Sequence, residues 1–137
     1  FMKDNSTSER QVLQLCSNIT FVDGLSSEKF SFQMTPEEKA QRRLYYAEQL
    51  SLVTQKACQE NYDVLFLDEV IYTIGAGLLD EALLLDFLQN KPEHLEVILT
   101  GRNPGEKLLH MADYVSEIHK IKHPFDRGLP ARKGIER

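Results

Sequence analysis

Two adjacent carboxylates, Asp68 and Glu69, directly follow the apolar run Val64–Leu67. A run of this length is typical of a strand buried on both faces, with helices covering each side. Acids at its carboxyl end would lie at the edge of a parallel sheet, where open α/β proteins bind ligands. A carboxylate there commonly holds Mg²⁺ against a nucleotide's phosphates. The pair therefore indicates phosphate chemistry, with an acid that only caps the next turn as the alternative.

A second candidate is Arg102, in the turn 100–102 that follows another apolar run at 95–99. Parallel strands end at one edge of a sheet, so we expect this turn to lie beside the two acids. A fixed cation and the free N–H groups of a following helix can together hold an anion. For an isolated Gly-Arg pair, a surface ion pair is the simpler interpretation. Beside an acid-terminated strand, the phosphate interpretation is at least as good, and both stay open.

Two further segments could contact a ligand. Phe30 and Phe32 lie in a stretch without clear periodicity and could form a lid over a flat ligand. From spacing alone, a hydrophobic staple onto the next helix is favoured. The tail from residue 122 mixes cations, an aromatic residue, prolines and glycines, and Lys122, His123 and Lys133 are its candidate phosphate ligands. Such a tail can fold over a polyanion or simply be solvated.

The glycine-rich phosphate loop G-x-x-x-x-G-K-[ST] occurs nowhere in residues 1–137. The chain starts at Phe1 without an initiator methionine, near what resembles the end of an apolar element. We therefore expect a cut edge at this terminus, with the loop upstream of it. It follows that these 137 residues alone should be inactive or nearly so.

Composition limits the other possibilities. A chain of 137 residues fits one domain, 1–137. The net charge of −5 argues against a nucleic-acid partner, and no stretch approaches the roughly 18 apolar residues of a membrane span. Cys16 and Cys58 have no CxxC spacing, so we expect both to be buried in a reducing compartment, and the protein to be cytoplasmic.

Strands that alternate with helices predict the architecture that would position these residues. We expect an α/β fold, a three-layer α/β/α sandwich with a mainly parallel sheet. The long helix is the best defined, because Thr35 can cap it and Pro36 suits its first position. The expected helices are 6–16, 36–60, 80–90 and one starting at Asn103-Pro104, and the expected strands are 19–22, 64–67, 95–99 and 114–118.

Taken together, these segments resemble the P-loop family of corrinoid adenosyltransferases. The T-G-R and K-H-P-F-D-x-G segments would not be expected together in a generic ATPase. The resemblance implies a P-loop NTPase (RecA-like) fold that lacks its first strand and phosphate loop here. The segments that carry it are V-L-F-L-D-E at 64–69, V-I-L-T-G-R at 97–102, A-D-Y-V-S-E at 112–117, I-K-H-P-F-D-R-G at 121–128 and K-G-I-E at 133–136.

The resemblance implies a reaction: transfer of the 5′-deoxyadenosyl group of ATP to the cobalt of a reduced corrinoid, with release of triphosphate. Glu69 matches the family's Mg²⁺-binding acid, with Asp68 as its supporting neighbour, and Arg102 matches a phosphate-side position. Phe30 and Phe32 align with an aromatic pair of the family that displaces the lower axial ligand of cobalt. The resemblance therefore favours contact with the ligand over the hydrophobic staple. The commonest pattern is F-x-W, so Phe32 keeps apolar bulk but lacks the indole N–H.

The resemblance further implies a homodimer and a possible reductase partner. Two alternatives remain from the residues. Another P-loop ATPase or kinase would turn over nucleotide without regard to corrinoid. A non-catalytic binding module would lack the phosphate loop altogether.

Overall fold

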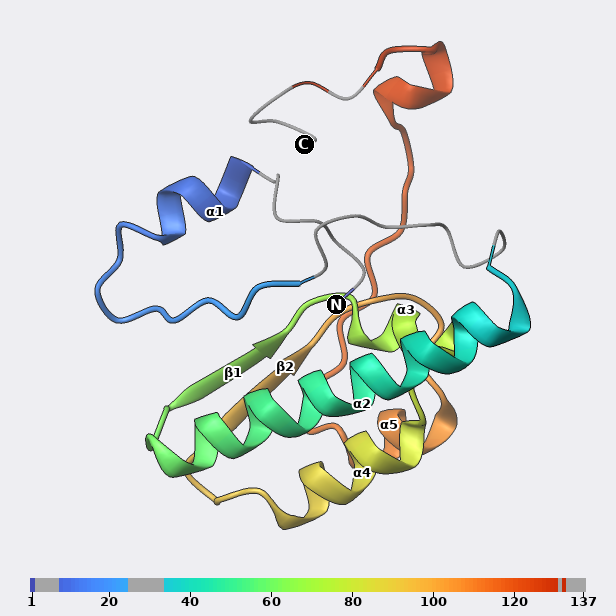
Figure 1. Cartoon of the computed structure of the whole chain (residues 1–137). Coiled ribbons are helices and arrows are strands. Elements are labelled where there is room, and N and C mark those ends of the chain that lie inside the picture. The colour runs from blue at the N-terminus through green and yellow to red at the C-terminus, as the bar shows by residue number, and fades with distance from the viewer. Residues whose placement is uncertain (2–7, 25–33, 131, 133–137) are drawn as a thin grey trace.

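The sheet in the described part of the chain has two parallel strands, β1 (Val64–Leu67) and β2 (Glu96–Leu99). The structure is a computed structural model, and it describes residues 1, 8–24, 34–130 and 132 (Figure 1). The strands pair in register from Val64 with Glu96 to Leu67 with Leu99. The predicted parallel α/β arrangement is therefore confirmed, whereas the three-layer sandwich and its P-loop type stay predictions.

The long helix α2 (Pro36–Gln59) lies along the sheet, as Figure 1 shows. It begins with a capping box: the Thr35 hydroxyl accepts from the Glu38 N–H at 3.2 Å, and the Glu38 carboxylate accepts from the Thr35 N–H at 2.8 Å. Its buried stripe of Tyr46, Leu50, Thr54 and Ala57 follows the helical period. The predicted helix at 36–60 is thus confirmed.

The connection from β1 to β2 contains two helices that close the core. The first, α3 (Val70–Gly75), was not expected and follows the acid pair without a loop. The second, α4 (Glu81–Asn90), begins where predicted, with the Asp80 side chain accepting from the Ala82 N–H at 2.9 Å. The core gathers buried residues from α2, β1 and this connection, namely Tyr46, Leu50, Leu67, Val70, Leu78, Leu79 and Leu84, together with Leu108 further along the chain.

Three smaller elements complete the described part: α1 (Ser8–Leu13), α5 (Glu106–Met111) and the 3-10 helix η2 (Pro124–Arg127). Helix α1 stops short of the expected residue 16, because tighter i→i+3 bonds such as Cys16 N–H to Leu13 C=O end it. Cys16 is exposed, contrary to expectation. Helix α5 begins at Glu106 rather than Asn103, because Asn103 has φ 54°, outside the extended region of an N-cap residue.

Two predicted strands, 19–22 and 114–118, are wrong. Neither segment pairs with β1 or β2 in the described part of the chain, and residues 114–118 are exposed, with Ile118 at 96%. Apolar composition gives strand propensity, but a strand also needs a neighbour whose N–H and C=O groups are unpaired. The stretch without clear periodicity that holds Phe30 and Phe32 lies outside the described residues.

Strand β1 is not buried on both faces, which corrects the expectation from its sequence. Leu67 is buried, but Val64 and Phe66 are 51% and 55% exposed. Both line a cleft of about 650 Å³ that also borders α2 and residues 19–24. The covered face of β1 is the one that packs into the core.

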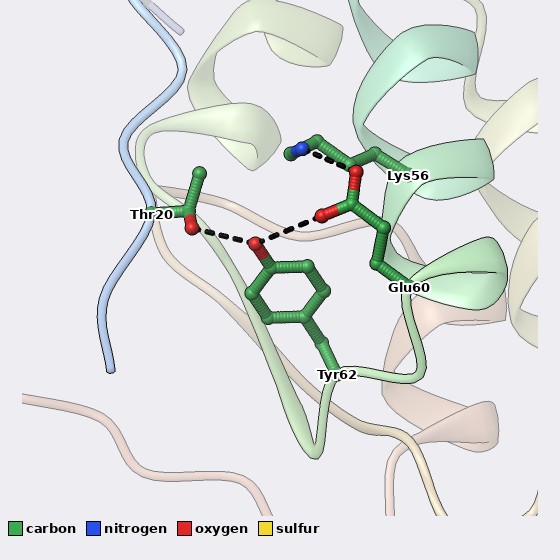
Figure 2. Close-up of polar contacts among 4 residues, drawn as sticks. All are labelled: Thr20, Lys56, Glu60 and Tyr62. Carbon is green, nitrogen blue, oxygen red and sulfur yellow. Dashed lines mark hydrogen bonds and ion pairs between the residues drawn. The ribbon is translucent and has the colours of Figure 1, made fainter. Parts of the chain in front are cut away.

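A network of four polar side chains holds residues 19–24 against the end of α2 (Figure 2). The Tyr62 hydroxyl lies 2.5 Å from that of Thr20 and donates to the Glu60 carboxylate at 3.3 Å. Lys56 donates to the same carboxylate at 2.5 Å. The hydrogen bond from Lys56 is the main reason that the pKa of Glu60 is lowered, and the same bond raises the pKa of Lys56.

We predict that this network adds a small acid-sensitive contribution to the free energy of unfolding. The folded pKa of Glu60 lies below its ordinary value of 4.5, so the contribution is present above pH 4.5 and is lost as the pH falls through the folded pKa. Glu60→Gln should therefore reduce the loss of stability on acidification, measured by urea unfolding at several pH values. Glu48→Gln, on an exposed residue of the same helix, should leave the pH profile unchanged; equal profiles for wild type and Glu60→Gln would contradict the assignment.

Candidate functional site

The acid pair after β1 and the turn after β2 lie side by side at the carboxyl edge of the sheet. The Thr100 hydroxyl donates to Asp68 Oδ1 at 2.9 Å, and the Thr100 N–H donates to the Leu67 carbonyl at 3.3 Å. The proximity expected from the parallel strands is therefore confirmed. Asp68, Glu69 and Thr100 are each half-buried, which places polar groups in a position only partly screened by water.

The backbone of Glu69 has an unusual conformation, with φ 59° and ψ 15° in the left-handed region. Residues other than glycine enter this region at a cost of roughly 1–2 kcal/mol, and such residues gather at functional sites. Three hydrogen bonds stabilise it here. The Glu69 N–H donates to Thr100 Oγ1 at 2.9 Å, and the Glu69 carbonyl accepts from both the N–H and the hydroxyl of Thr73.

The carboxylate of Glu69 does not cap the helix that follows it. Glu69 is the N-cap residue of α3 by position, but its side chain makes no capping hydrogen bond. It also makes no ion pair within the described residues. The alternative of an acid that only caps the next turn therefore fails for Glu69, and its half-buried carboxylate stays available to a ligand.

Gly101 allows the two turns to approach closely. Its φ is +144°, and a Cβ on this residue would lie 2.6 Å from the Tyr72 nitrogen and 2.7 Å from the Ile71 Cβ. The Ile71 N–H donates to the Thr100 carbonyl at 3.1 Å across the same contact. Only glycine fits this backbone conformation at this distance from α3.

Arg102 follows Gly101 and is exposed. Within the described residues it forms no hydrogen bond or ion pair. The alternative interpretation, a surface ion pair, therefore finds no support there. Arg102 follows Thr100 by two residues, so its backbone lies near the edge of the sheet that holds the acid pair.

Residues 122–130 of the basic tail lie apart from the sheet and from α2 in Figure 1, and Lys122 and His123 are exposed. His123 Nδ1 accepts from the Phe125 N–H at 3.1 Å, and Lys120 pairs with Asp126 at 2.7 Å. These contacts organise η2 but do not connect it to the acid pair. Phe30, Phe32 and Lys133 lie outside the described residues, so their predicted roles stay predictions.

The donor set at the edge fits Mg²⁺ on chemical grounds. Mg²⁺ is commonly bound by one or two carboxylates, and its remaining positions go to water and substrate phosphates. Asp68 and Glu69 supply two carboxylates. No group of three or more metal-ligating side chains occurs among the residues described, so a cage made wholly of protein ligands is absent from that part.

Sequence reasoning identified the acids and the turn but assigned no role to two threonines. Thr73 is completely buried and holds the Glu69 carbonyl, and Thr100 connects the two strand ends. Thr100 directly follows β2, just as the two acids directly follow the neighbouring strand β1. This pattern could have identified Thr100. Thr73 lies in α3, which the sequence did not predict, so its contact with Glu69 was not expected.

The fold and this edge define an α/β protein with two carboxylates at the end of parallel strands, as a candidate ligand site. The family model for ATP:corrinoid adenosyltransferase BtuR/CobO/CobP matches residues 1–137, and the chain belongs to this family.

Curated relatives match over part of the chain. A corrinoid adenosyltransferase of Sinorhizobium sp is 40% identical over 78 residues, which are 56% of this chain and 36% of the relative. The corrinoid adenosyltransferase CobA of Salmonella typhimurium is 38% identical over 74 residues, 54% of this chain and 38% of the relative. One from Pseudomonas aeruginosa is 29% identical over 85 residues, 62% of this chain and 42% of the relative. The matches thus span well under half the length of these relatives.

None of the helices in the described ranges is both long and apolar enough to cross a membrane.

Proposed function

We propose that the protein transfers the 5′-deoxyadenosyl group of ATP to the cobalt of a reduced corrinoid and releases triphosphate. The observation that carries the proposal is the family match over residues 1–137. The half-buried carboxylate of Glu69, which no described side chain neutralises, supports it, because a departing triphosphate requires a bound cation at this edge. In this proposal the fold is of the P-loop NTPase type.

The reaction balances without a further reactant once cobalt is Co(I). Cobalt supplies an electron pair to C5′ of the ATP ribose, and a Co–C bond forms. The C5′–O bond breaks, and its electron pair leaves with the triphosphate. Cobalt is thereby formally oxidised from Co(I) to Co(III), and ATP loses its adenosyl group.

The chain's own residues would bind and orient the reactants. Glu69 would hold Mg²⁺ together with Asp68, and a bound Mg²⁺ neutralises charge on the leaving phosphates. Arg102 would add a cation on the phosphate side. The hydrogen bond from Thr100 to Asp68 supports this assignment, because it joins the ends of the two strands that carry these residues.

Residues outside this edge have proposed roles as well. Phe30 and Phe32 would cover the lower face of the corrinoid, exclude water and displace the axial ligand. Lys122, His123 and Lys133 would bind phosphate when the tail folds over the nucleotide. Because His123 Nδ1 already accepts from Phe125, its Nε2 is the atom available to a phosphate oxygen. A cytoplasmic homodimer that receives its reduced corrinoid from a reductase completes the proposal.

The test is an anaerobic incubation of the full-length natural protein with reduced cobalamin, ATP and Mg²⁺. We expect the absorption spectrum of an adenosylated cobalt product and one triphosphate for each product formed. Phe30→Ala with Phe32→Ala should slow the reaction but leave ATP binding intact. Formation of ADP and phosphate without regard to corrinoid would favour a different ATPase or kinase, and absence of nucleotide binding would favour a non-catalytic module.

A further inference from the structure

The hydroxyl of Thr100 makes two hydrogen bonds with fixed directions. It carries one proton, which it donates to Asp68 Oδ1 at 2.9 Å. Its oxygen therefore accepts from the Glu69 N–H, also at 2.9 Å. A single side chain thus orients the carboxylate of one acid and the main chain of the other.

The backbone of Thr100 is fixed on both sides, so this hydroxyl has little freedom to move. Its N–H donates to the Leu67 carbonyl of β1, and its carbonyl accepts from the Ile71 N–H at the start of α3. Thr100 therefore connects three segments, the end of β1, the beginning of α3 and its own strand. Side chains fixed in this way are suited to hold a ligand site in one geometry.

We propose that Thr100 is a positioning residue that holds Asp68 and Glu69 in the arrangement that binds the divalent cation. The inference rests on the proposed function, in which these two acids bind Mg²⁺. It adds a residue that contacts no substrate and acts through its hydrogen bonds to both acids.

The physical reason lies in the conformation of Glu69. Its left-handed backbone is unfavourable for a residue with a side chain, so it persists only while neighbouring groups hold it. Without the Thr100 hydroxyl, the half-buried Glu69 N–H loses its acceptor and Asp68 loses a donor. The Glu69 carboxylate then samples several orientations, Asp68 is held by one bond fewer, and a cation must order them on binding.

Thr54 provides a control because its hydroxyl bonds within α2 and to neither acid. It is buried, and its hydroxyl donates to the Leu50 carbonyl at 2.8 Å. Thr54→Val should therefore lower stability, because it removes a buried hydrogen bond. It should change cation affinity little.

The experiment measures Mn²⁺ affinity from the EPR signal of free Mn²⁺, with full-length protein and no nucleotide. Thr100→Val keeps the shape but lacks the hydroxyl, and it should bind Mn²⁺ about 10- to 100-fold more weakly. Thr100→Ser keeps the hydroxyl and should stay within about threefold of wild type, as should Thr54→Val. Glu69→Gln serves as the reference for loss of the site.

The outcomes separate this inference from the proposed function. Wild-type affinity in Thr100→Val, with affinity lost in Glu69→Gln, would overturn the role of Thr100 and leave the acid site standing. Equal Mn²⁺ binding by wild type and Glu69→Gln would instead remove the acid site itself. If Thr100→Val does not fold, the Mn²⁺-induced rise in melting temperature of Thr100→Ala is compared with that of Thr100→Ser. An equal rise in both would overturn the proposal.

Discussion

Glu69→Gln should lower kcat/KM for the proposed adenosyl transfer by at least about 100-fold, the scale seen when one group that stabilises developing charge is removed. Glutamine has nearly the same shape but no charge, so it can no longer balance a cation held against the leaving triphosphate. The fold should remain intact, because the Glu69 carboxylate makes no hydrogen bond or ion pair with the described residues, and its backbone contacts do not depend on charge. The measurements are steady-state rates at several Mg²⁺ concentrations, with thermal unfolding alongside.

Glu96→Gln provides the matched control for this prediction. Glu96 is an exposed carboxylate at the start of β2, at the opposite end of the strand from the acid pair. Removing its charge should leave kcat/KM within about twofold of wild type, because a surface charge one strand length away is largely screened. A rate for Glu69→Gln equal to that of the control would contradict the role given to Glu69.

The proximity of the two strand ends that form the candidate site could be predicted from sequence, because the pattern that marks each end is local. An apolar run of four residues that ends in two acids indicates both a strand and a polar edge, and the same reasoning applies to residues 95–102. Neighbouring parallel strands then bring the two ends together, as the bond between Thr100 and Asp68 confirms. The capping box at Thr35 is another local signal, and it located the long helix correctly.

Strand prediction failed where pairing, rather than propensity, decides the structure. Residues 114–118 contain apolar and β-branched side chains, but in the described part they pair with neither strand, and Ile118 is almost fully exposed. The same reasoning applies to residues 19–22, where a hydroxyl contact between Thr20 and Tyr62 stands in place of a strand ladder. A single segment's composition does not specify whether a partner edge is available.

The details of the site depend on contacts between residues far apart in sequence. The Glu69 N–H finds its acceptor 31 residues away, on Thr100, and this contact helps to hold a left-handed backbone that no local pattern indicates. The direction of the Thr100 hydroxyl follows only once Asp68 and Glu69 are both placed around it. At positions of this kind sequence reasoning is expected to fall short, because contacts between distant residues override local preference.

Gly101→Ala should destabilise the fold by about 3–5 kcal/mol, the combined scale of an unfavourable backbone conformation and an overpacked contact. The φ of +144° is rarely adopted by a residue with a side chain, and the new Cβ would lie 2.6 Å from the Tyr72 nitrogen. That nitrogen belongs to the backbone of α3, so it cannot yield as a flexible side chain would. Relief requires the turn to move away from α3, which would break the bond between the Ile71 N–H and the Thr100 carbonyl.

Gly75→Ala is the control for Gly101→Ala. It tests whether the loss of stability depends on the position of the glycine or follows from any methyl group added near α3. Gly75 is the last residue of α3, and a Cβ there meets nothing within 4 Å. Alanine should therefore be neutral or stabilise the protein by up to about 1 kcal/mol, since it favours the helix and restricts the unfolded chain. Urea unfolding of both variants gives the comparison. A loss below about 1 kcal/mol in Gly101→Ala would mean that the two turns can separate without cost, and the close contact that places Thr100 against the acid pair would then not be needed for folding.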